Sequence, residues 1–364
     1  MKIVIIGAHL SPALAVIEQL GNTEIYYLGR KHTFEGDKAI SLEYQEIAKL
    51  GISFYPINAA RLQRKFTRHT IPSLIRFPLG FCQSLKTLRQ IKPDVVLGFG
   101  GYVSLPVVLV SFFLKIPIVI HEQTLEAGFA NKLEAKFASK ICISWKSSEK
   151  YFPKNKTVLT GNPLRRIILK TKPPKKEDGL PIIYITGGSS GSHAINSLVE
   201  KSLEKLLEKF VIIHQLGDAK AYADFEKLQA GKNKLDVSIA KNYNLQKFYS
   251  PDNAAKNLSS ADLVVGRAGI NTVTELIYFA KPAFLIPLPF AQRNEQLKNA
   301  TFLKELGLGE IGLQNTLTSE VFVSTISAML KNLKAYQLKE KVLITDAAEN
   351  IVKVVKDVST KKAA

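Results

Sequence analysis

The stretch DLVVGRAGINTVTELIYFA, residues 262–280, runs from an apolar segment through a glycine turn into a second, mostly apolar segment. A short run such as Leu263–Val265 predicts a buried strand, and the residues after Gly269 predict the start of a helix. Two interpretations of that start are open. Thr272 and Glu275 have the spacing of a capping box, which satisfies the first N–H groups of a helix internally. Alternatively, those N–H groups and the positive end of the helix dipole bind an anion.

The same succession of strand and helix recurs along the whole chain. Val- and Ile-rich runs of strand length occur at Ile3–Ile6, Ile25–Leu28, Val95–Leu97, Ile118–Ile120, Ile141–Ile143, Ile182–Ile185, Val211–Ile213, Leu263–Val265 and Ala283–Ile286. Continuous apolar runs suit strands that are covered on both faces, and helical periods lie between them. The pattern therefore predicts an α/β fold with parallel sheets.

Chain length and one linker predict two domains. The chain has 364 residues, which is long for one core. Residues 162–181 are rich in proline and charge, and a new strand follows them. We expect Rossmann-like domains over residues 1–162 and 163–344, with a helix at about 345–360 that can pack back across either domain and that we assign to the first. Ligands bind beyond the carboxyl ends of strands in such sheets, so two sheets facing one another predict a site in the cleft between them.

The charge of the chain predicts an anionic partner. The formal net charge is +19, and no Asp or Glu occurs between Ile47 and Pro93, where many Arg and Lys fall. Apolar residues are interleaved with these cations over residues 61–81. Nucleic-acid binders, proteins on anionic membranes and ordinary basic surface helices can all show this pattern. No recognition motif accompanies the charge, so we expect a membrane surface as the partner and no nucleic acid.

The cysteines and apolar runs indicate the compartment. The chain has two cysteines, Cys82 and Cys142, which fits a reducing environment and offers no metal or disulfide framework. The longest apolar region, residues 103–120, is interrupted by prolines and a lysine and predicts a helix and a strand rather than a membrane span. The apolar run at residues 3–6 ends too early for a signal peptide. We expect a peripheral protein on the cytoplasmic face of the membrane.

Four glycine turns follow predicted strands, and each is a candidate phosphate site. They contain Gly7 with His9 and Pro12; Gly98, Gly100 and Gly101; Gly187, Gly188 and Gly191 with Ser189 and Ser190; and Gly269. Glycine permits close approach of a ligand to the backbone, and N–H groups at helix starts bind phosphate oxygens. Each turn taken alone also fits a tight turn or a serine cap. Together, in two domains, they favour a nucleotide-diphosphate ligand.

Further groups complete the predicted site. His9 is either a turn residue or a general base, because imidazole titrates near neutrality. Residues 287–300, PLPFAQRNEQLKNA, offer donors and acceptors for sugar hydroxyls or form a solvated loop. No Asp-x-Asp occurs, nor any His, Cys and Asp cluster at metal-ligand spacing. We therefore expect no metal or other cofactor, and a diphosphate stabilised by main-chain amides, helix dipoles and arginines.

Several motifs together resemble the MurG family of bacterial UDP-N-acetylglucosamine (UDP-GlcNAc) transferases, which convert lipid I to lipid II in peptidoglycan synthesis. They are KPDVVLGFGGYVSLP (92–106), IPIVIHEQTLEAGFANK (116–132), TGNPLR (160–165), TGGSSGSHAIN (186–196) and ADLVVGRAGINTVTELIYFAKPAFLIPLPFAQRNEQLKNA (261–300). The similarity runs in the same order from Lys2 to about residue 330. It implies the glycosyltransferase B fold, two Rossmann-like domains facing a cleft, and metal-independent, inverting transfer.

The resemblance also implies residue roles. The matched donor-site positions are Arg165, Gly188, Ser189, Gly191, Gly269, Ile270, Asn271, Thr272, Glu275, Glu295 and Gln296, with Phe248 or Tyr249 near the uracil-side segment. Glu275 would bind the ribose hydroxyls, and Gln296 with Glu295 the hydroxyls of GlcNAc. The acceptor-side positions, which would face the acceptor diphosphate, are Gly7, His9, Gly100, Gly101, Tyr102 and Thr124. Residues 61–81 would rest on the membrane.

Two departures from the family pattern affect the acceptor side. The family's first turn, Gly-Gly-Thr-Gly-Gly-His, is shortened here to Gly7-Ala8-His9, so part of the phosphate cradle is missing. The family's His-Glu-Gln-Asn ends here in Thr124, so a hydroxyl replaces an amide.

The predicted reaction is transfer of GlcNAc to the 4-hydroxyl of a lipid-linked N-acetylmuramic acid (MurNAc). His9 is the first candidate for the base that this reaction needs, and Glu122 the second. A UDP-GlcNAc epimerase, another lipid glycosyltransferase and a non-catalytic nucleotide-sugar-binding membrane protein remain as alternatives.

Overall fold

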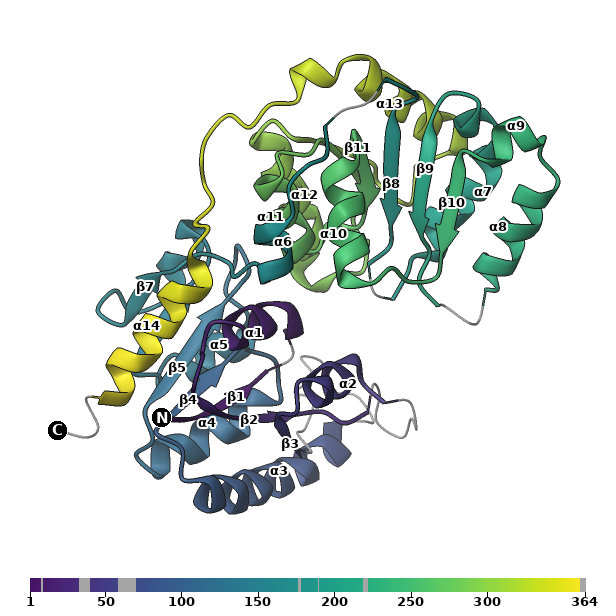
Figure 1. Cartoon of the computed structure of the whole chain (residues 1–364). Coiled ribbons are helices and arrows are strands. Elements are labelled where there is room, and N and C mark those ends of the chain that lie inside the picture. Colours follow the sequence, from purple (N-terminus) through teal and green to yellow (C-terminus); the bar gives the residue numbers. More distant parts are fainter. Residues whose placement is uncertain are drawn as a thin grey trace. The chain divides into compact units, whose positions relative to one another are not determined.

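The computed structural model of the chain describes residues 1–7, 9–32, 40–57, 70–175, 178–188, 190–218 and 222–360. The chain forms two compact units, one made of residues 1–166 with 344–364 and the other of residues 167–343 (Figure 1). The short helix α6, Arg166–Lys170, spans the point where the first unit ends and the second begins. Within the described ranges, no helix combines the length and the apolarity needed to cross a bilayer.

The first unit is built on a seven-stranded parallel sheet with the order β3-β2-β1-β4-β5-β6-β7. Its strands are β1 (Lys2–Ile6), β2 (Glu24–Gly29), β3 (Ser53–Pro56), β4 (Val95–Gly98), β5 (Ile118–Glu122), β6 (Lys140–Ile143) and β7 (Thr157–Leu159). Its helices are α1 (Leu10–Ile17), α2 (Leu42–Lys49), α3 (Thr70–Ile91), α4 (Ser104–Phe113), α5 (Phe129–Glu134), the 3₁₀ helix η1 (Lys146–Tyr151) and α14 (Ala347–Thr360). The strand order reverses between β1 and β4, and ligands of doubly wound sheets bind at such a switch point.

Both faces of this sheet are buried. Side chains alternate across a strand, so Ile3 and Ile5 join one apolar cluster while Val4 and Ile6 join another. The first cluster includes residues of α1 and α14, and the second includes residues of α3 and α4. Figure 1 shows α14, in yellow, lying along the first sheet although it comes from the far end of the chain. Burial on both faces explains the continuous apolar runs in the sequence.

The second unit is a six-stranded parallel sheet with the order β10-β9-β8-β11-β12-β13. Its strands are β8 (Ile182–Thr186), β9 (Val211–Gln215), β10 (Tyr243–Gln246), β11 (Leu263–Gly266), β12 (Ala283–Leu285) and β13 (Gly309–Ile311). Its helices are α7 (His193–Leu207), α8 (Asp224–Asn233), α9 (Val237–Ala240), α10 (Pro251–Ser260), α11 (Ile270–Tyr278), η2 (Gln292–Asn294), α12 (Glu295–Glu305), α13 (Ser319–Lys331) and η3 (Leu333–Ala335). Here the order reverses between β8 and β11. The predicted α/β fold with two Rossmann-like domains is confirmed.

A buried chain of hydrogen bonds joins β9 and β10 to α7 and α8 in the second unit. The Tyr243 hydroxyl donates to Nδ1 of His214 over 2.9 Å, and Nε2 of His214 donates to Oδ1 of Asn196 over 3.1 Å. The Asn196 amide donates to Asp224 over 2.7 Å, and Asp224 also accepts from Nδ1 of His193 over 2.7 Å. His214 is fully buried, and burial lowers its pKa to about 3, with the charge of Asp224 opposing the shift. The network thus depends on a neutral imidazole.

Because the network needs a neutral His214, we expect the free energy of unfolding to fall at acidic pH. The pKa of His214 lies below its value in an unfolded chain, so the stabilisation is complete above about pH 6.5 and is lost as the pH falls toward 3. From pH 7 to pH 5 the wild-type protein should lose about 2 kcal/mol through this group. Denaturant unfolding of His214→Gln at both pH values should show a smaller loss, and the exposed His32→Gln should behave as wild type. An equal acid loss in His214→Gln and wild type would contradict the assignment.

Candidate functional site

Three turns of the second unit begin at the same edge of its sheet. Gly266 at the end of β11 pairs with Thr186 of β8 and Leu285 of β12, so the carboxyl ends of these strands are level. The turn after β8 leads to α7, the turn after β11 leads to α11, and the segment after β12 leads to α12. The candidate donor-site residues of this unit therefore lie on these turns and on the helices that follow them, around the switch point.

The N-terminus of α11 has no side-chain cap. Its N-cap is Gly269, which has no side chain to accept a hydrogen bond, and no side-chain cap bond forms there. Thr272 is the third residue inside the helix rather than its cap, so the capping-box interpretation of Thr272 and Glu275 is wrong. Because α11 begins just after β11, the positive end of its dipole lies at the carboxyl edge of the sheet, and no side-chain cap covers it. Such a terminus can hold an anion.

The turn after β8 is organised differently. Ser192 caps α7 by accepting from the Ile195 N–H over 3.4 Å, and Thr186 Oγ1 accepts from the Gly188 N–H over 3.1 Å. Gly191 has a positive φ of 73°, and a Cβ there would lie 2.1 Å from the Leu216 carbonyl oxygen, so this turn is pressed against the end of β9. Ser189 lies outside the described residues. Side chains therefore accept from some of the main-chain N–H groups at the turn before α7, whereas no side-chain cap forms at the start of α11.

The sugar-side candidates lie on α11 and α12. Glu275 is half-buried, and its charge contributes, after burial, to raising the pKa of Tyr184 on β8. Gln296 Oε1 accepts from the Leu288 N–H over 2.9 Å, which folds the proline-containing segment back onto α12. Glu295 is the first residue of α12, directly after the left-handed Asn294 at φ 56°. Phe248 is exposed beyond β10.

Two residues that sequence reasoning missed support these turns. Arg267 donates to the Ile286 carbonyl over 2.9 Å and to Gln314 Oε1 over 2.6 Å, joining the ends of β11 and β12. Asn299 is fully buried and donates to the Ala268 carbonyl over 3.0 Å. Both are polar residues inside the motif at residues 261–300, which was the only sign of a special role. Their hydrogen-bond partners lie 19 or more residues away in the sequence, so the sequence alone did not reveal the contacts.

The first unit gathers its candidates at the corresponding edge. Gly7 follows β1 with φ 148°, and a Cβ there would lie 2.8 Å from Phe99, so the turns after β1 and β4 touch. Tyr102, after the Gly100–Gly101 turn, accepts a hydrogen bond from Nη1 of Arg30 over 3.0 Å. Arg30 follows β2 and therefore reaches past the end of β1. Sequence reasoning missed this guanidinium because the contact spans three strands.

Glu122 is held by four hydrogen bonds. The buried carboxylate accepts from Thr124 N over 2.9 Å, Thr124 Oγ1 over 2.7 Å, Gly128 N over 2.8 Å and Asn131 Nδ2 over 2.9 Å. The Thr124 hydroxyl also contacts the Glu126 carbonyl, so its one hydrogen is shared between two acceptors, whereas the other three donors to Glu122 are N–H groups. His9 is half-buried nearby; burial lowers its pKa, and the charge of Glu122 opposes that shift. The arrangement pairs a neutral imidazole with a fixed carboxylate.

Arg165 belongs to the first unit and is held there by an ion pair. Its Nε and Nη2 each lie 3.4 Å from Oε1 of Glu18, which follows α1. Glu18 Oε2 also accepts from the Arg166 N–H over 2.7 Å. This ion pair fixes the chain just before α6.

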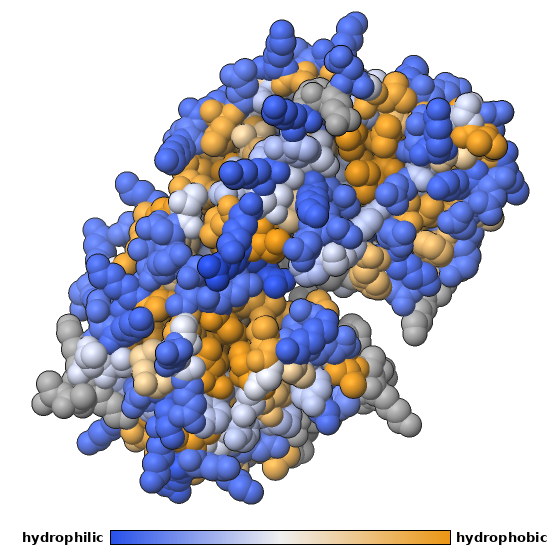
Figure 2. Space-filling model, viewed as in Figure 1, coloured by the Kyte–Doolittle hydropathy of each residue, from blue (hydrophilic) through white to orange (hydrophobic). Residues whose placement is uncertain are grey.

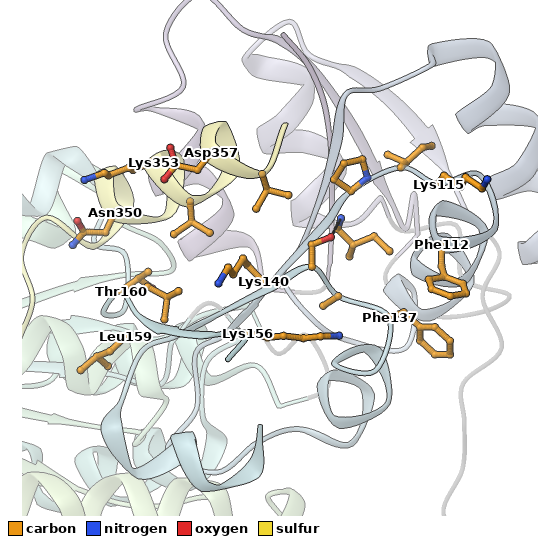
Figure 3. Close-up of a pocket in the computed structure, with 18 residues that line it drawn as sticks. Phe112, Lys115, Phe137, Lys140, Lys156, Leu159, Thr160, Asn350, Lys353 and Asp357 are labelled. Carbon is orange, nitrogen blue, oxygen red and sulfur yellow. Dashed lines mark hydrogen bonds between the residues drawn. The ribbon is translucent and has the colours of Figure 1, made fainter. Parts of the chain in front are cut away.

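A pocket of about 1050 Å³ opens elsewhere on the first unit, between α14, β7 and the end of α4 (Figure 3). Lys115, Lys140, Lys156 and Lys353 line it beside a single acid, Asp357, and its lining includes the rings of Phe112 and Phe137. None of the predicted site residues lines this pocket. Over the described part of the chain, no three His, Cys, Asp or Glu side chains cluster as metal ligands would.

Comparison with known proteins identifies the family of the chain. The glycosyltransferase family 28 N-terminal domain matches residues 6–143, and the C-terminal domain of that family matches residues 182–356. A Clostridium botulinum protein named UDP-N-acetylglucosamine--N-acetylmuramyl-(pentapeptide) pyrophosphoryl-undecaprenol N-acetylglucosamine transferase is 30% identical, over 98% of each chain. A Geobacter metallireducens protein of that name is 35% identical, over 89% of this chain and 87% of its own.

A solved structure supports the same family. The crystal structure of Acinetobacter baumannii MurG matches with a TM-score of 0.71 and 27% identity, covering 98% of this chain and 99% of that one. With two Rossmann-like sheets, glycine turns at their carboxyl edges and relatives matched over nearly full length, the chain belongs to the MurG family of glycosyltransferase family 28.

Proposed function

We propose that this chain transfers GlcNAc from UDP-GlcNAc to the 4-hydroxyl of lipid-linked MurNAc, forming lipid II with inversion at the anomeric carbon. The observation that carries the proposal is the α11 N-terminus, which has no side-chain cap and lies at the switch point of the second sheet. A diphosphate there would receive hydrogen bonds from main-chain N–H groups and the favourable end of the dipole. The relatives named above carry the same activity in their names.

The negative charge that develops on the leaving UDP must be stabilised in the transition state. UDP gains negative charge as the glycosidic bond breaks, so fixed donors at the diphosphate stabilise the transition state more than the ground state. Removing one such donor typically costs about 3 kcal/mol in the barrier. Glu275, on the same helix, would bind the ribose hydroxyls, and Gln296 on α12 the GlcNAc hydroxyls.

The donor assignment predicts a specific effect of Glu275→Ala. We expect donor affinity measured by calorimetry with UDP-GlcNAc to fall roughly 10- to 100-fold, as expected for loss of hydrogen bonds to a charged group. The melting temperature should fall less than the loss of a capping box would cause, because Glu275 takes no part in one. The matched control is Glu305→Ala, an exposed carboxylate at the end of α12. Unchanged donor affinity together with early melting would contradict the assignment.

His9 suits the role of general base better than Glu122. A base needs a free lone pair for the proton of the attacking hydroxyl. Four donors already occupy the Glu122 carboxylate. Burial keeps the imidazole of His9 neutral, and the nearby charge of Glu122 would stabilise the imidazolium that forms on proton transfer.

This choice predicts different kinetics for two variants. His9→Asn should lower kcat for UDP release, with UDP-GlcNAc and a lipid I analogue, by about 10² to 10⁴ while leaving donor affinity unchanged. Glu122→Gln cannot accept all four hydrogen bonds, so it should lower both stability and activity. Full turnover by His9→Asn would refute the base assignment. Wild-type protein that binds the donor but releases no UDP with acceptor would support a non-catalytic binder, and acceptor-independent epimerisation would support an epimerase.

We further propose that the first unit rests on the anionic cytoplasmic face of the membrane. Residues 61–69 of the predicted basic and apolar stretch lie outside the described residues. In the described part, Leu79 on α3 and Phe113 on α4 are exposed, and the ring of Phe113 lies 6.3 Å from that of Phe81. Hydrophobic patches occur among hydrophilic residues on the face shown in Figure 2. Exposed aromatic rings beside basic residues are typical of surfaces that insert shallowly into anionic bilayers.

Sedimentation with anionic liposomes tests this surface. Binding should be strong at low salt and weaker at high salt, since lysine and arginine contribute about 1 kcal/mol each near an anionic surface. Phe113→Ser should weaken binding at both salt concentrations. Phe290→Ser, which removes a still more exposed ring from the second unit, is the control and should bind as wild type. Absence of binding by wild type at either salt concentration would refute the membrane proposal.

A further inference from the structure

Glu134 is a fully buried carboxyl group with no role in the proposed mechanism. It ends α5, and Oε1 lies 2.5 Å from Oγ of Ser104, the first residue of α4. Its Oε2 is buried without a hydrogen-bond partner among the described residues. A Cβ placed on Gly98 at the end of β4 would lie 3.8 Å from that Oε2. Glu134 therefore lies directly behind the turn that carries Gly100, Gly101 and Tyr102.

The number of hydrogens available at Ser104 indicates that the Glu134 carboxyl group is protonated. Ser104 Oγ lies 2.6 Å from the Gly101 carbonyl oxygen and 2.5 Å from Glu134 Oε1. A hydroxyl has one hydrogen to donate, and a carbonyl oxygen can only accept. One hydrogen cannot fully serve both acceptors, and both contacts become full hydrogen bonds if Ser104 donates to Gly101 and Glu134 donates its own proton to Ser104.

The surroundings of Glu134 favour that protonated form. Burial raises its pKa to about 8; the hydrogen bond to Ser104 opposes the shift, and the charge of Glu122 adds to it. Elements α4 and β5 pack against α5, and Gly98 of β4, a strand without titratable groups, approaches Glu134. The residues of α4 include no titratable group, and β5 contributes Glu122 and His121, whose imidazole hydrogen-bonds to Ser144. On α5 itself, Lys132 directs its ammonium over the Tyr151 ring at 4.0 Å.

We infer that Glu134 is a positioning residue that acts as a neutral acid and locks the turn between β4 and α4. Its proton leaves the Ser104 hydroxyl free to hold the Gly101 carbonyl. On ionisation, Ser104 can satisfy only one of its two acceptors, and the Gly101 tether competes with a buried carboxylate. The expected effect on acceptor binding rests on the proposed function, because the turn that Glu134 holds is the one proposed to face the acceptor diphosphate.

The kinetic consequence is a dependence of acceptor binding on pH. If the locked turn binds acceptor, the apparent affinity follows the protonated fraction of Glu134. That fraction falls about tenfold between pH 7 and pH 9 for a pKa of about 8. The acceptor KM of wild type should rise by that factor over this range, while the donor KM should not follow it.

The experiment compares wild type with E134Q. An amide donates to Ser104 but cannot ionise, so the acceptor KM of E134Q should stay flat from pH 7 to pH 9. E149Q, which removes a carboxyl of η1 in the same unit, should keep the wild-type rise. An alkaline rise that persists in E134Q overturns the inference. If E134Q does not fold, S104A replaces it: without the hydroxyl tether, the acceptor KM should be raised at pH 7 and flat to pH 9.

A second readout does not depend on turnover. The infrared C=O band of a protonated carboxylic acid should be present in the wild-type minus E134Q difference spectrum at pH 7 and absent at pH 10. A difference spectrum without that band at pH 7 overturns the inference even if the enzyme is active. Wild-type protein that shows the band but lacks transferase activity would instead refute the proposed function and leave the protonated Glu134 supported.

Discussion

The N–H groups at the start of a helix are the constraint on which the proposed donor site of the second unit depends. Every α-helix begins with N–H groups that have no partner inside the helix. In α7 the Ser192 side chain takes one of them. In α11 the N-cap is Gly269, so no side chain does so, and the strand before it delivers this terminus to the edge where neighbouring turns converge. Within this account, a diphosphate is the natural complement of that terminus.

In the first unit, two carboxyl groups are buried beside the proposed acceptor site. Glu122 lies within hydrogen-bond distance of four donors, and its charge opposes the fall in the pKa of His9. Glu134 has one close partner, and burial beside Glu122 favours its neutral form. The two carboxyl groups thus have opposite electrostatic roles although both lie under the same turns.

The sequence predicted the interior of both sheets and missed their edges. All nine predicted strand runs correspond to strands, whereas the four unpredicted strands, β3, β7, β10 and β13, are the outer strands of the two sheets. Interior strands are covered on both faces and must be continuously apolar; an outer strand such as β10 alternates buried and exposed residues and carries a weaker signal. Likewise, the glycine turns could be read from the chain, but the Arg30–Tyr102 and Arg165–Glu18 contacts join distant segments. The sequence left the capping-box alternative open because spacing alone does not fix the first residue of a helix.

The central claim is that main-chain donors at the α11 N-terminus hold the donor diphosphate. A crystal structure of this chain with UDP-GlcNAc tests it most directly. The account predicts diphosphate oxygens within hydrogen-bond distance of the first main-chain N–H groups of α11, with the Glu275 carboxylate on the ribose hydroxyls. An occupied site in which the diphosphate lies away from α11, or in which Glu275 points away from the nucleotide, would contradict it.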